Sequence, residues 1–577
     1  MWIFDLFRKK KKLEAPWSKF YTKEQLNIKI PDISMYDEVK NSREKYPKNA
    51  AIKYMGKVIN YEKLLKKIDN LSKGFYDLGI RKGDIVTILL PNVPEALISL
   101  YALNKIGAIA NMTHPLSAEE EIKETLISTN SKYLIIYDAR YSKIESFIKN
   151  IGVKKVIFVS PGDSLNFIKR TFFNLSQLFK FKHHPISKQF ISYRNFYFKS
   201  IFKKNFQVKK YGKNTPAVIL HSGGTSGKSK NVVIQNRAFI YAAIGEKIDL
   251  IRLVPGDSAL AIMPNFHGFG LSVLMHTPLA LGCSTILVPK FNSKKFDTLF
   301  KKTKPTCVLG VPTLFEALSN SNNEKNLDLS FLKYVISGGD LLSKKLEDKI
   351  NKYLKDHNSD ARITQGYGLS EALACVTMAH DHVNKSGSVG IPLAGNHVKI
   401  IDTSTRKTMP YGKEGEIVIN SKALMMGYLN DEVETNEALQ IHNDGHIWLH
   451  TGDLGYMDED GFLFYKGRIK RMIITSGYNV YPSHIEEVIE SHPAVLQCSV
   501  VGVPHPYKQE VPKAFIVLNK GYIGLFEKKE IKEYCIKHLA KYMVPSEFVI
   551  RKKLPKTKLG KVDFNKLKKD SGDDEIE

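Results

Sequence analysis

The stretch most informative about the fold runs from Ala217 to Lys230 and reads Ala-Val-Ile-Leu-His-Ser-Gly-Gly-Thr-Ser-Gly-Lys-Ser-Lys. Its apolar start predicts a buried strand, and the glycines, hydroxyls and lysines after it predict a loop that binds phosphate. Glycines let backbone N–H groups approach an oxyanion, hydroxyls donate further hydrogen bonds, and lysine supplies positive charge. The β-branched residues Val232, Val233 and Ile234 follow, so we expect a second strand and a hairpin across the phosphates.

Two other interpretations of this loop stay open at this point. A Walker loop needs glycine at position 222, where the chain has Ser222, and it opens directly into a helix, whereas β-branched residues follow here. The second alternative is a plain glycine turn without a ligand.

The segments on both sides of this loop predict layered α/β structure. Between Tyr61 and Asp138, helix-like segments alternate with β-branched runs at 85–90 and 133–137, and the alternation resumes after Pro216. The uncharged stretch 269–289 is interrupted by proline and glycine, so we interpret it as a buried helix followed by a strand, not as a membrane span. After Gly467 a smaller α/β pattern begins, with strands expected at 500–503 and 514–518.

Composition narrows the class of protein. The 577 residues are 43% apolar and 25% charged, which excludes disordered and collagen-like chains. Lysine and arginine number 86 against 59 acidic residues, a net charge of +27, which favours an anionic partner such as a nucleotide, a nucleic acid or an acidic membrane. Five cysteines without a CxxC pair exclude a disulfide framework and a zinc ribbon, and a reducing cytosol fits best. The apolar block at the N-terminus is too short for a signal peptide, so we expect a cytoplasmic protein.

Residues 164–213 form an insertion that contains no aspartate or glutamate but many aromatic and basic residues. One interpretation is a basic surface loop that covers the core, and the other is an amphipathic element that faces a membrane. With the basic N-terminal segment Trp2–Lys12, the insertion predicts reversible binding to an anionic membrane surface. Aromatics between lysines also suit single-stranded nucleic acid, but no RNA-binding fold surrounds them, and we expect no nucleic acid partner.

The sequence resembles the adenylate-forming superfamily of acyl-CoA synthetases, luciferases and peptide-synthetase adenylation domains. Its phosphate loop usually reads Thr-Ser-Gly-Thr-Thr-Gly-x-Pro-Lys-Gly, and residues 222–231 match it except at three main places. Gly223 replaces serine, as in fatty acyl-CoA ligases, and Ser229 and Asn231 replace proline and glycine. The nucleotide-binding residues that the resemblance implies in this loop are Ser222, Gly223, Gly224, Thr225, Ser226, Gly227 and Lys230.

Further motifs of the superfamily follow in the expected order. His267, in Pro264–Gly270, resembles the histidine between the carboxylate and the nucleotide. In residues 365–371, Tyr367 corresponds to the aromatic residue that stacks on adenine, and Glu371 to the Mg²⁺ ligand. The implied nucleotide-binding residues of this motif and of Ser337–Asp340 are Gly338, Gly339, Asp340, Gly366, Tyr367, Gly368 and Ser370.

The C-terminal motifs supply ribose, hinge and lid residues. Asp453 resembles the aspartate that accepts hydrogen bonds from both ribose hydroxyls, and Arg468 the arginine that meets ribose or phosphate. Arg471 occupies the hinge pivot, where the superfamily more often has aspartate or lysine. Gly477 lies in a loop resembling the one that lines the pantetheine tunnel, and Lys561 in the loop that carries the adenylation lysine.

The resemblance, over residues 30 to 565, implies an α/β fold. A large multi-subdomain N-terminal adenylate-forming domain (21–467) is expected to carry a small mobile α+β C-terminal lid (468–565), flanked by an N-terminal segment (1–20) and a polar tail (566–577). The segments 16–21 and 30–36 further resemble bacterial long-chain fatty acid CoA ligases.

The implied activity is that of a fatty acyl-CoA synthetase. A fatty acid reacts with ATP to give acyl-AMP and pyrophosphate, with Mg²⁺ on Glu371 and Thr225, and the acyl group then passes to CoA. The catalytic residues that this implies are Lys561, His267, Thr225 and Glu371. Alternatives are an acyl-carrier-protein ligase, another carboxylic acid–CoA ligase, and a nonenzymatic lipid binder at the membrane surface. Acyl chain length, thiol acceptor and a homodimeric assembly are left open.

Overall fold

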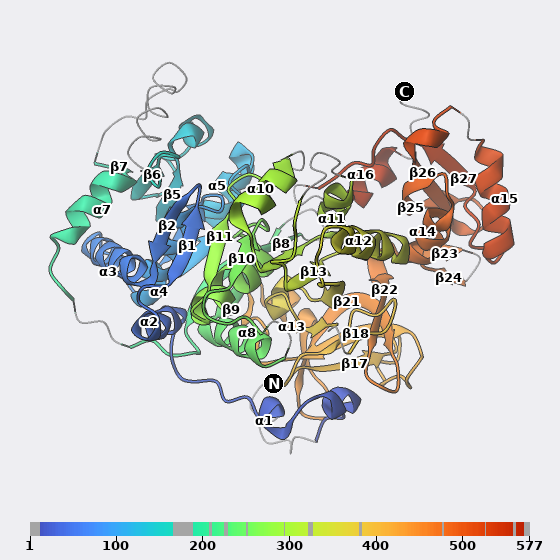
Figure 1. Cartoon of the computed structure of the whole chain (residues 1–577), viewed down its shortest axis with the longest axis horizontal. Coiled ribbons are helices and arrows are strands. Elements are labelled where there is room, and N and C mark those ends of the chain that lie inside the picture. Colours follow the sequence, from blue (N-terminus) through green and yellow to red (C-terminus); the bar gives the residue numbers. More distant parts are fainter. Residues whose placement is uncertain are drawn as a thin grey trace.

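The computed structural model describes residues 12–165, 188–206, 210–223, 229–249, 252–292, 295–320, 327–379, 383–475, 478–524, 527–557 and 561–570. In these residues the strands form four sheets, two large ones and two of five strands each. Figure 1 shows the two large sheets with their helices on one side of the molecule and the C-terminal elements, in red, at the opposite end.

The first large sheet has eight strands and carries the stretch Ala217–Lys230. Its strands, in sheet order, are β19 (Gly427–Tyr428), β9 (Ser229–Gln235), β8 (Pro216–Gly223), β4 (Ile109–Met112), β3 (Ile85–Leu89), β5 (Tyr133–Tyr137), β6 (Lys155–Val159) and β7 (Phe190–Ser192). Strands β8 to β7 run parallel to one another, whereas β8 and β9 form an antiparallel hairpin in which Gly223 pairs with Ser229. This hairpin confirms the prediction from Val232–Ile234 and excludes a Walker loop, which would open into a helix.

The second large sheet has nine strands. In sheet order they are β16 (Ile391–Pro392), β15 (Thr377–Met378), β14 (Ile363–Tyr367), β13 (Tyr334–Gly338), β12 (Cys307–Gly310), β10 (Ser258–Ala261), β11 (Ser284–Leu287), β1 (Ala50–Tyr54) and β2 (Lys57–Asn60). The strands from β14 to β1 are parallel, as crossover helices require.

Helices cover both sheets, and one hydrophobic core includes residues from both. The elements of this part are η2 (Pro16–Phe20), α1 (Lys23–Leu26), α2 (Met35–Lys45), α3 (Tyr61–Asp77), α4 (Pro94–Lys105), α5 (Glu119–Ser128), η3 (Asp138–Lys143), α7 (Tyr193–Ile201), α8 (Asn236–Asp249), η4 (Phe269–His276), α9 (Thr277–Ala280), α10 (Phe296–Thr303), α11 (Pro312–Ser319), α12 (Lys344–Asp356) and η6 (Ser370–Ala372). Every residue of α4 from Pro94 to Asn104 is buried, since this helix is apolar on nearly all sides.

The segment 269–289 contains a buried helix and a strand, as its sequence predicts, but the helix is a π-helix over Phe269–His276. The backbone is closely packed at the start of this helix, because a Cβ atom at Gly270 would lie 2.1 Å from the carbonyl oxygen of Pro264. π-Helical turns are rare and occur often at functional sites. Among the described residues, no helix combines the length and apolar character needed to span a bilayer.

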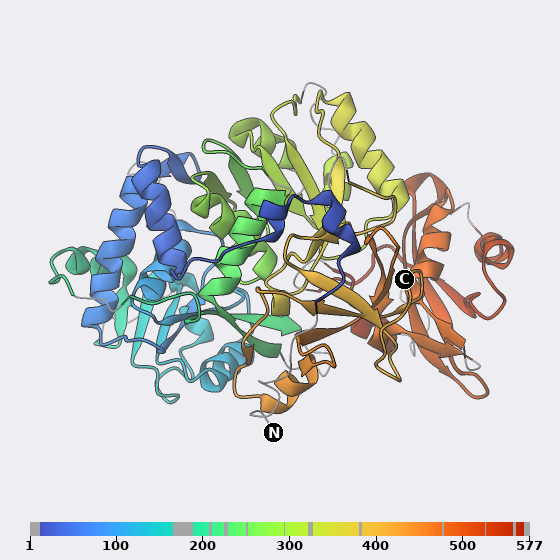
Figure 2. The ribbon, with the colours of Figure 1, turned by 90° about the horizontal axis from the view of Figure 1, so that it is seen from below.

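The third sheet is antiparallel and lies beside the two large ones (Figure 2). Its elements are β17 (His397–Ile401), β18 (Gly415–Asn420), α13 (Glu432–Ala438), β20 (Leu439–Ile441), β21 (Ile447–Met457) and β22 (Leu463–Arg468). Trp17 of the N-terminal segment is buried near this sheet, with its ring centroid 6.0 Å from that of His397.

The C-terminal part has its own sheet and its own core. Its elements are η7 (Ile469–Arg471), β23 (Ile473–Thr475), β24 (Tyr478–Val480), α14 (Pro482–Ser491), β25 (Val495–His505), β26 (Gln509–Leu518), η8 (Lys520–Tyr522), α15 (Lys528–His538), β27 (Glu547–Ile550) and α16 (Phe564–Lys569). The strands predicted at 500–503 and 514–518 fall within β25 and β26, which are longer because they form one continuous antiparallel hairpin.

Candidate active site

Three motifs that are far apart in sequence meet at the carboxyl ends of β13 and β14. Ser337 pairs with Gln365 and Gly338 with Gly366, so two of the motifs lie in register on neighbouring strands. A Cβ atom at Gly338 would lie 3.4 Å from the Gly366 carbonyl oxygen and 3.5 Å from the ring of Phe269. Ligands of parallel α/β sheets bind beyond the carboxyl ends of the strands, so this edge is the candidate site.

The turn after Tyr367 is tightly constrained. A Cβ atom at Gly368 would lie 1.1 Å from the carbonyl oxygen of Ala374, so only glycine fits. Leu373 and Ala374 adopt φ values of 51° and 85°, which non-glycine residues rarely take. Backbone of this kind is found most often at ligand-binding and active sites. Glu371 lies in this turn, on η6.

Asp453 is a buried carboxylate with two partners. It lies on β21 with 2% of its surface exposed, and the Tyr367 hydroxyl donates a hydrogen bond of 2.8 Å to its Oδ2. Arg468, directly opposite on β22, places Nε 3.0 Å from Oδ1. Burial raises the pKa of Asp453, and the Arg468 guanidinium opposes this shift. Asp453 in turn raises the pKa of Arg468, which therefore stays charged.

Lys561 reaches this site from the C-terminal part. Its Nζ would lie 3.9 Å from a Cβ atom at Gly339, whose φ of +80° suits glycine. Burial lowers the pKa of Lys561, while the nearby Asp340 and Asp453 carboxylates act in the opposite direction. The loop that carries the lysine is closed by a 2.7 Å hydrogen bond from the Thr557 N–H to the Lys561 carbonyl.

His267 lies in a group of three histidines. Burial lowers its pKa to about 4, with smaller contributions from Lys561, His114 and His221. Burial also lowers the pKa of His221 to about 4, and its Nε2 lies 2.7 Å from Asn111 Oδ1. Both imidazoles are therefore neutral at pH 7.

Glu371 is held by a residue on the opposite sheet. The Tyr428 hydroxyl donates a hydrogen bond of 3.1 Å to its Oε1. Burial and the Glu371 carboxylate both raise the pKa of Tyr428, which therefore remains a donor at all physiological pH values. Lys230 Nζ lies 4.6 Å from the centre of the Tyr428 ring and forms an ion pair with Glu434 of α13.

The Arg471 side chain forms a hydrogen bond and a cation–π contact with residues of the C-terminal part. Its Nη2 donates to Glu486 Oε1 at 2.7 Å, and its guanidinium lies 3.4 Å from the centre of the Phe564 ring. The side chain predicted at the pivot thus packs against α14 and α16 of the C-terminal part.

The structure brings together most of the residues that the sequence predicts for the site. Its described part does not include Gly224, Thr225, Ser226, Gly227 and Gly477. Ser222 and Gly223 end β8 at the hairpin, and Ser370 begins η6 next to Glu371. Throughout the described ranges, no group of three or more histidine, cysteine, aspartate or glutamate side chains is arranged to hold a metal ion.

Sequence reasoning missed Tyr428, Glu434, His114, His221 and Tyr465. His221 had a signal, because it directly precedes Ser222 at the end of the predicted strand. Tyr465, whose ring centroid lies 5.8 Å from that of Tyr367, precedes the hinge motif on β22. Tyr428, Glu434 and His114 lie in no local pattern that indicates a role in the site.

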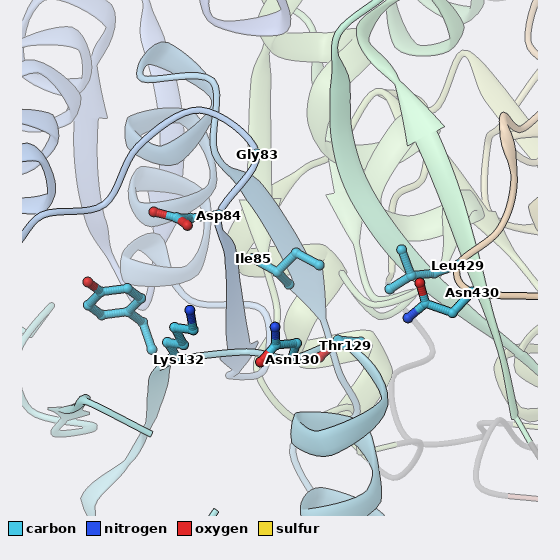
Figure 3. Close-up of a pocket in the computed structure, with 9 residues that line it drawn as sticks. Gly83, Asp84, Ile85, Thr129, Asn130, Lys132, Leu429 and Asn430 are labelled. Carbon is cyan, nitrogen blue, oxygen red and sulfur yellow. The ribbon is translucent and has the colours of Figure 1, made fainter. Parts of the chain in front are cut away.

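A surface pocket elsewhere on the molecule is separate from this site. It has a volume of about 270 Å³ and is lined by residues at the amino ends of β3 and β5, including Asp84, Asn130 and Lys132, with Asn430 opposite (Figure 3). The candidate site lies at carboxyl ends of strands, so this pocket does not belong to it.

Comparison with known proteins identifies the family to which the chain belongs. The model of the AMP-binding enzyme family matches residues 39–429, and that of the AMP-binding enzyme C-terminal domain matches residues 484–561. A long-chain-fatty-acid–CoA ligase of Bacillus subtilis is 32% identical over 559 residues, covering 95% of this chain and 97% of the relative. 4-Coumarate–CoA ligase 4 of Arabidopsis thaliana is 29% identical, covering 88% of this chain and 85% of the relative.

A solved structure shows the same fold. An anthranilate CoA ligase in complex with anthranoyl-AMP superposes with a TM-score of 0.81 at 21% identity, covering 95% of this chain and 98% of that one. The fold is that of the adenylate-forming acid–CoA ligases, with a large N-terminal and a small C-terminal domain. The chain belongs to the AMP-binding enzyme family. The resemblance inferred from the motifs is therefore confirmed.

Proposed function

We propose that this chain is a fatty acyl-CoA synthetase that activates a long-chain fatty acid with ATP and transfers the acyl group to CoA. The observation that carries the proposal is the arrangement of Lys561 and Asp453, which approach one site from two domains. A charge supplied by the smaller domain suits a reaction whose two steps need different surroundings.

In the first step, a carboxylate oxygen of the fatty acid attacks the α-phosphorus of ATP and the bond to pyrophosphate breaks, which leaves acyl-AMP. Two anions must approach each other, so the site must supply positive charge in place. Lys561 and Arg468 provide it, and Asp453 accepts hydrogen bonds from the ribose hydroxyls. The neutral His267 places a polar group beside the carboxylate without adding charge to the cluster.

Mg²⁺ would be held by Glu371 and Thr225 and would neutralise phosphate charge when bound. The Glu371 carboxylate fits this role, because Tyr428 fixes one of its oxygens and leaves acceptor capacity on the other. The loop from Ser222 to Lys230 is expected to cradle the β- and γ-phosphates.

In the second step, the sulfur of CoA attacks the acyl carbon and AMP leaves. Lys561 lies next to Gly339, which supports a second lid position in which the thiol takes the place of the lysine. A rotation of the C-terminal domain at residues 467–471 would withdraw Lys561 and bring Gly477 toward the pantetheine. The nucleophile comes from the substrate, and no cysteine takes part.

The long acyl chain is supported by the Bacillus subtilis relative and by the apolar π-helix that follows His267. Each buried methylene contributes about 0.8 kcal/mol, so eight further carbons add up to about 6 kcal/mol where a tunnel accepts them. The 4-coumarate relative makes an aryl acid the competing substrate.

The test is kcat/KM for octanoate, laurate, palmitate and 4-coumarate with CoA as acceptor. We expect palmitate or laurate to give the highest value. A preference for 4-coumarate, or for octanoate over palmitate, would overturn the long-chain assignment. Replacing CoA by an acyl carrier protein in the same assay separates the two acceptors.

A further inference from the structure

Helix α7 has one face fixed against the core. Tyr193, Phe196 and Ser200 are buried, and the Phe196 ring centroid lies 5.5 Å from that of Phe75 on α3. A Cβ atom at Gly74 of α3 would lie 1.9 Å from Ser200 Oγ, so the two helices approach closely. The orientation of α7 about its own axis is therefore set by packing.

Three apolar side chains are exposed on the side of α7 that faces away from the core, next to polar residues. Phe198, Ile201 and Phe202 keep 49%, 37% and 86% of their surface accessible. They stand at positions i, i+3 and i+4, so they form one patch at the end of the helix. We call these three residues the α7 tip. Neighbouring exposed apolar residues mark interaction sites more often than single ones do.

Basic side chains surround the α7 tip. Arg194 lies 5.6 Å from the centre of the Phe198 ring, and Lys199, Lys203 and Lys204 are exposed nearby. Lys203 forms an ion pair of 2.7 Å with Asp77 of α3. Residues 188–206 contain no aspartate or glutamate, so this rim has an excess of positive charge.

We propose that the α7 tip inserts into the surface of an anionic lipid bilayer. Large apolar side chains with a basic rim match the interface of such a bilayer, where rings enter the acyl boundary and cations meet phosphate groups. A net charge of +27 on the chain acts in the same direction. Both views place α7 at the end of the molecule opposite the C-terminal domain, so bilayer contact leaves the lid free to rotate (Figures 1 and 2).

The first experiment places a reporter at the tip of the full-length protein. Phe202→Trp is compared with Tyr507→Trp, a matched control with 93% exposure on the hairpin of β25 and β26 in the C-terminal domain. Vesicles contain phosphatidylcholine with phosphatidylglycerol, and part of the lipid is brominated so that it quenches tryptophan at short range. The wild-type signal is subtracted.

We expect the residue-202 fluorescence to shift to the blue and to be quenched, with the effect weakening as salt rises. Tyr507→Trp is expected to show neither change. Absence of quenching at residue 202, or equal quenching at both positions, overturns the proposal. Equal quenching with pure phosphatidylcholine vesicles overturns its anionic part. The tryptophan at residue 202 is quenched only by lipid close to it. Binding through Trp2–Lys12 alone leaves it unquenched and therefore counts against the proposal.

The second experiment measures affinity by vesicle flotation. The double variant Phe198→Ser/Phe202→Ser is expected to bind roughly tenfold more weakly than wild type, because two rings no longer enter the bilayer. Ile523→Ser, an exposed apolar position in the C-terminal domain, is the control and should bind like wild type. Unchanged flotation of the double variant overturns the proposal in favour of a protein partner for the α7 tip.

Adenylate formation from octanoate in vesicle-free solution should be equal in both variants and wild type. This readout separates the two hypotheses: failure of the ligase assignment removes pyrophosphate release from all three proteins, whereas failure of the membrane proposal removes only the difference in flotation.

Discussion

The two domains contribute to the active site in different ways. In the large domain, Tyr367 donates a hydrogen bond to Asp453 and Tyr428 donates one to Glu371. Arg468 forms an ion pair with Asp453. The C-terminal domain supplies Lys561, which meets the same site mainly through charge. The polar groups of the large domain are therefore held in place within that domain, whereas the C-terminal domain adds a positive charge to the candidate site.

The segment predicted to be the hinge, residues 468–471, also contacts the two domains through different side chains. Arg468 lies on β22 and pairs with Asp453 of the large domain, whereas Arg471 is bound by Glu486 and Phe564 of the lid. We therefore expect the proposed rotation of the C-terminal domain to occur at the short turn of Ile469 and Lys470, between these two fixed side chains.

The largest effect is expected for Lys561, the residue that the C-terminal domain supplies to the candidate site. Lys561→Ala should slow adenylate formation by about 10²–10³-fold, since removing one preorganised charged donor costs about 3–4 kcal/mol. Thioester formation from synthetic acyl-AMP should be nearly unchanged, because the lysine has left the site by then. The two half-reactions are assayed separately, with the exposed Lys552→Ala as control. Equal loss in both half-reactions would contradict a two-position lid.

Asp453→Ala tests the part of the candidate site that the large domain supplies. Asp453→Asn is an isosteric variant for comparison. Two hydrogen bonds from ribose to a charged acceptor are lost, each worth about 1.5–3 kcal/mol. We therefore expect ATP affinity to fall by roughly 100-fold or more, measured by calorimetry. Wild-type affinity in the alanine variant would show that the nucleotide binds elsewhere.

A third prediction concerns pH and the histidines beneath the site. The folded pKa of His221 is about 4, below its ordinary value of about 6.5, so the unfolded chain takes up the proton first as pH falls. Its contribution to stability is complete above pH 6.5 and is lost toward pH 4, by about 3 kcal/mol at most.

The thermal midpoint of wild type should therefore fall between pH 7 and pH 5, and His221→Asn should reduce that fall. His538→Asn, at an exposed position on α15, is the control and should keep the wild-type slope. A variant at residue 221 with the full wild-type slope would refute the role of this histidine.

The smallest effect is expected for the hydrogen bond between Tyr428 and Glu371 within the large domain. Tyr428→Phe keeps the ring beneath Lys230 but removes the donor to Glu371, a loss of about 0.5–1.5 kcal/mol. The Mg²⁺ concentration for half-maximal adenylation should rise about three- to tenfold, with the thermal midpoint unchanged. Tyr456→Phe, on the same domain's β21, is the control. No change in the Mg²⁺ requirement would mean that Tyr428 does not position Glu371.

The parts of the fold that sequence predicted are those set by local pattern. The strands β3 and β5, the β8–β9 hairpin and the separate C-terminal sheet follow from runs of β-branched residues and the glycines between them. A helix within 269–289 was predicted, but its π-helical form was not, because no local pattern distinguishes a π-helix from an α-helix.

The same limit applies to the site. Motif residues such as Asp453 and Glu371 were predicted because each lies in a short recognisable pattern. Tyr428 was not, since it is 57 residues from Glu371 and meets it only after two sheets have packed together. His221 reaches Asn111 because β4 and β8 lie side by side in parallel, which no local pattern indicates.

The order of strands in the nine-stranded sheet affects how the chain can be made. β1 pairs with β2, which directly follows it, but its other neighbour is β11. Residue 284, where β11 begins, leaves the ribosome 230 residues after Tyr54. At about 5–20 residues per second this takes roughly 10–50 seconds. During that interval the nascent chain presents an unpaired strand edge, which exposes it to aggregation and makes it a substrate for chaperones.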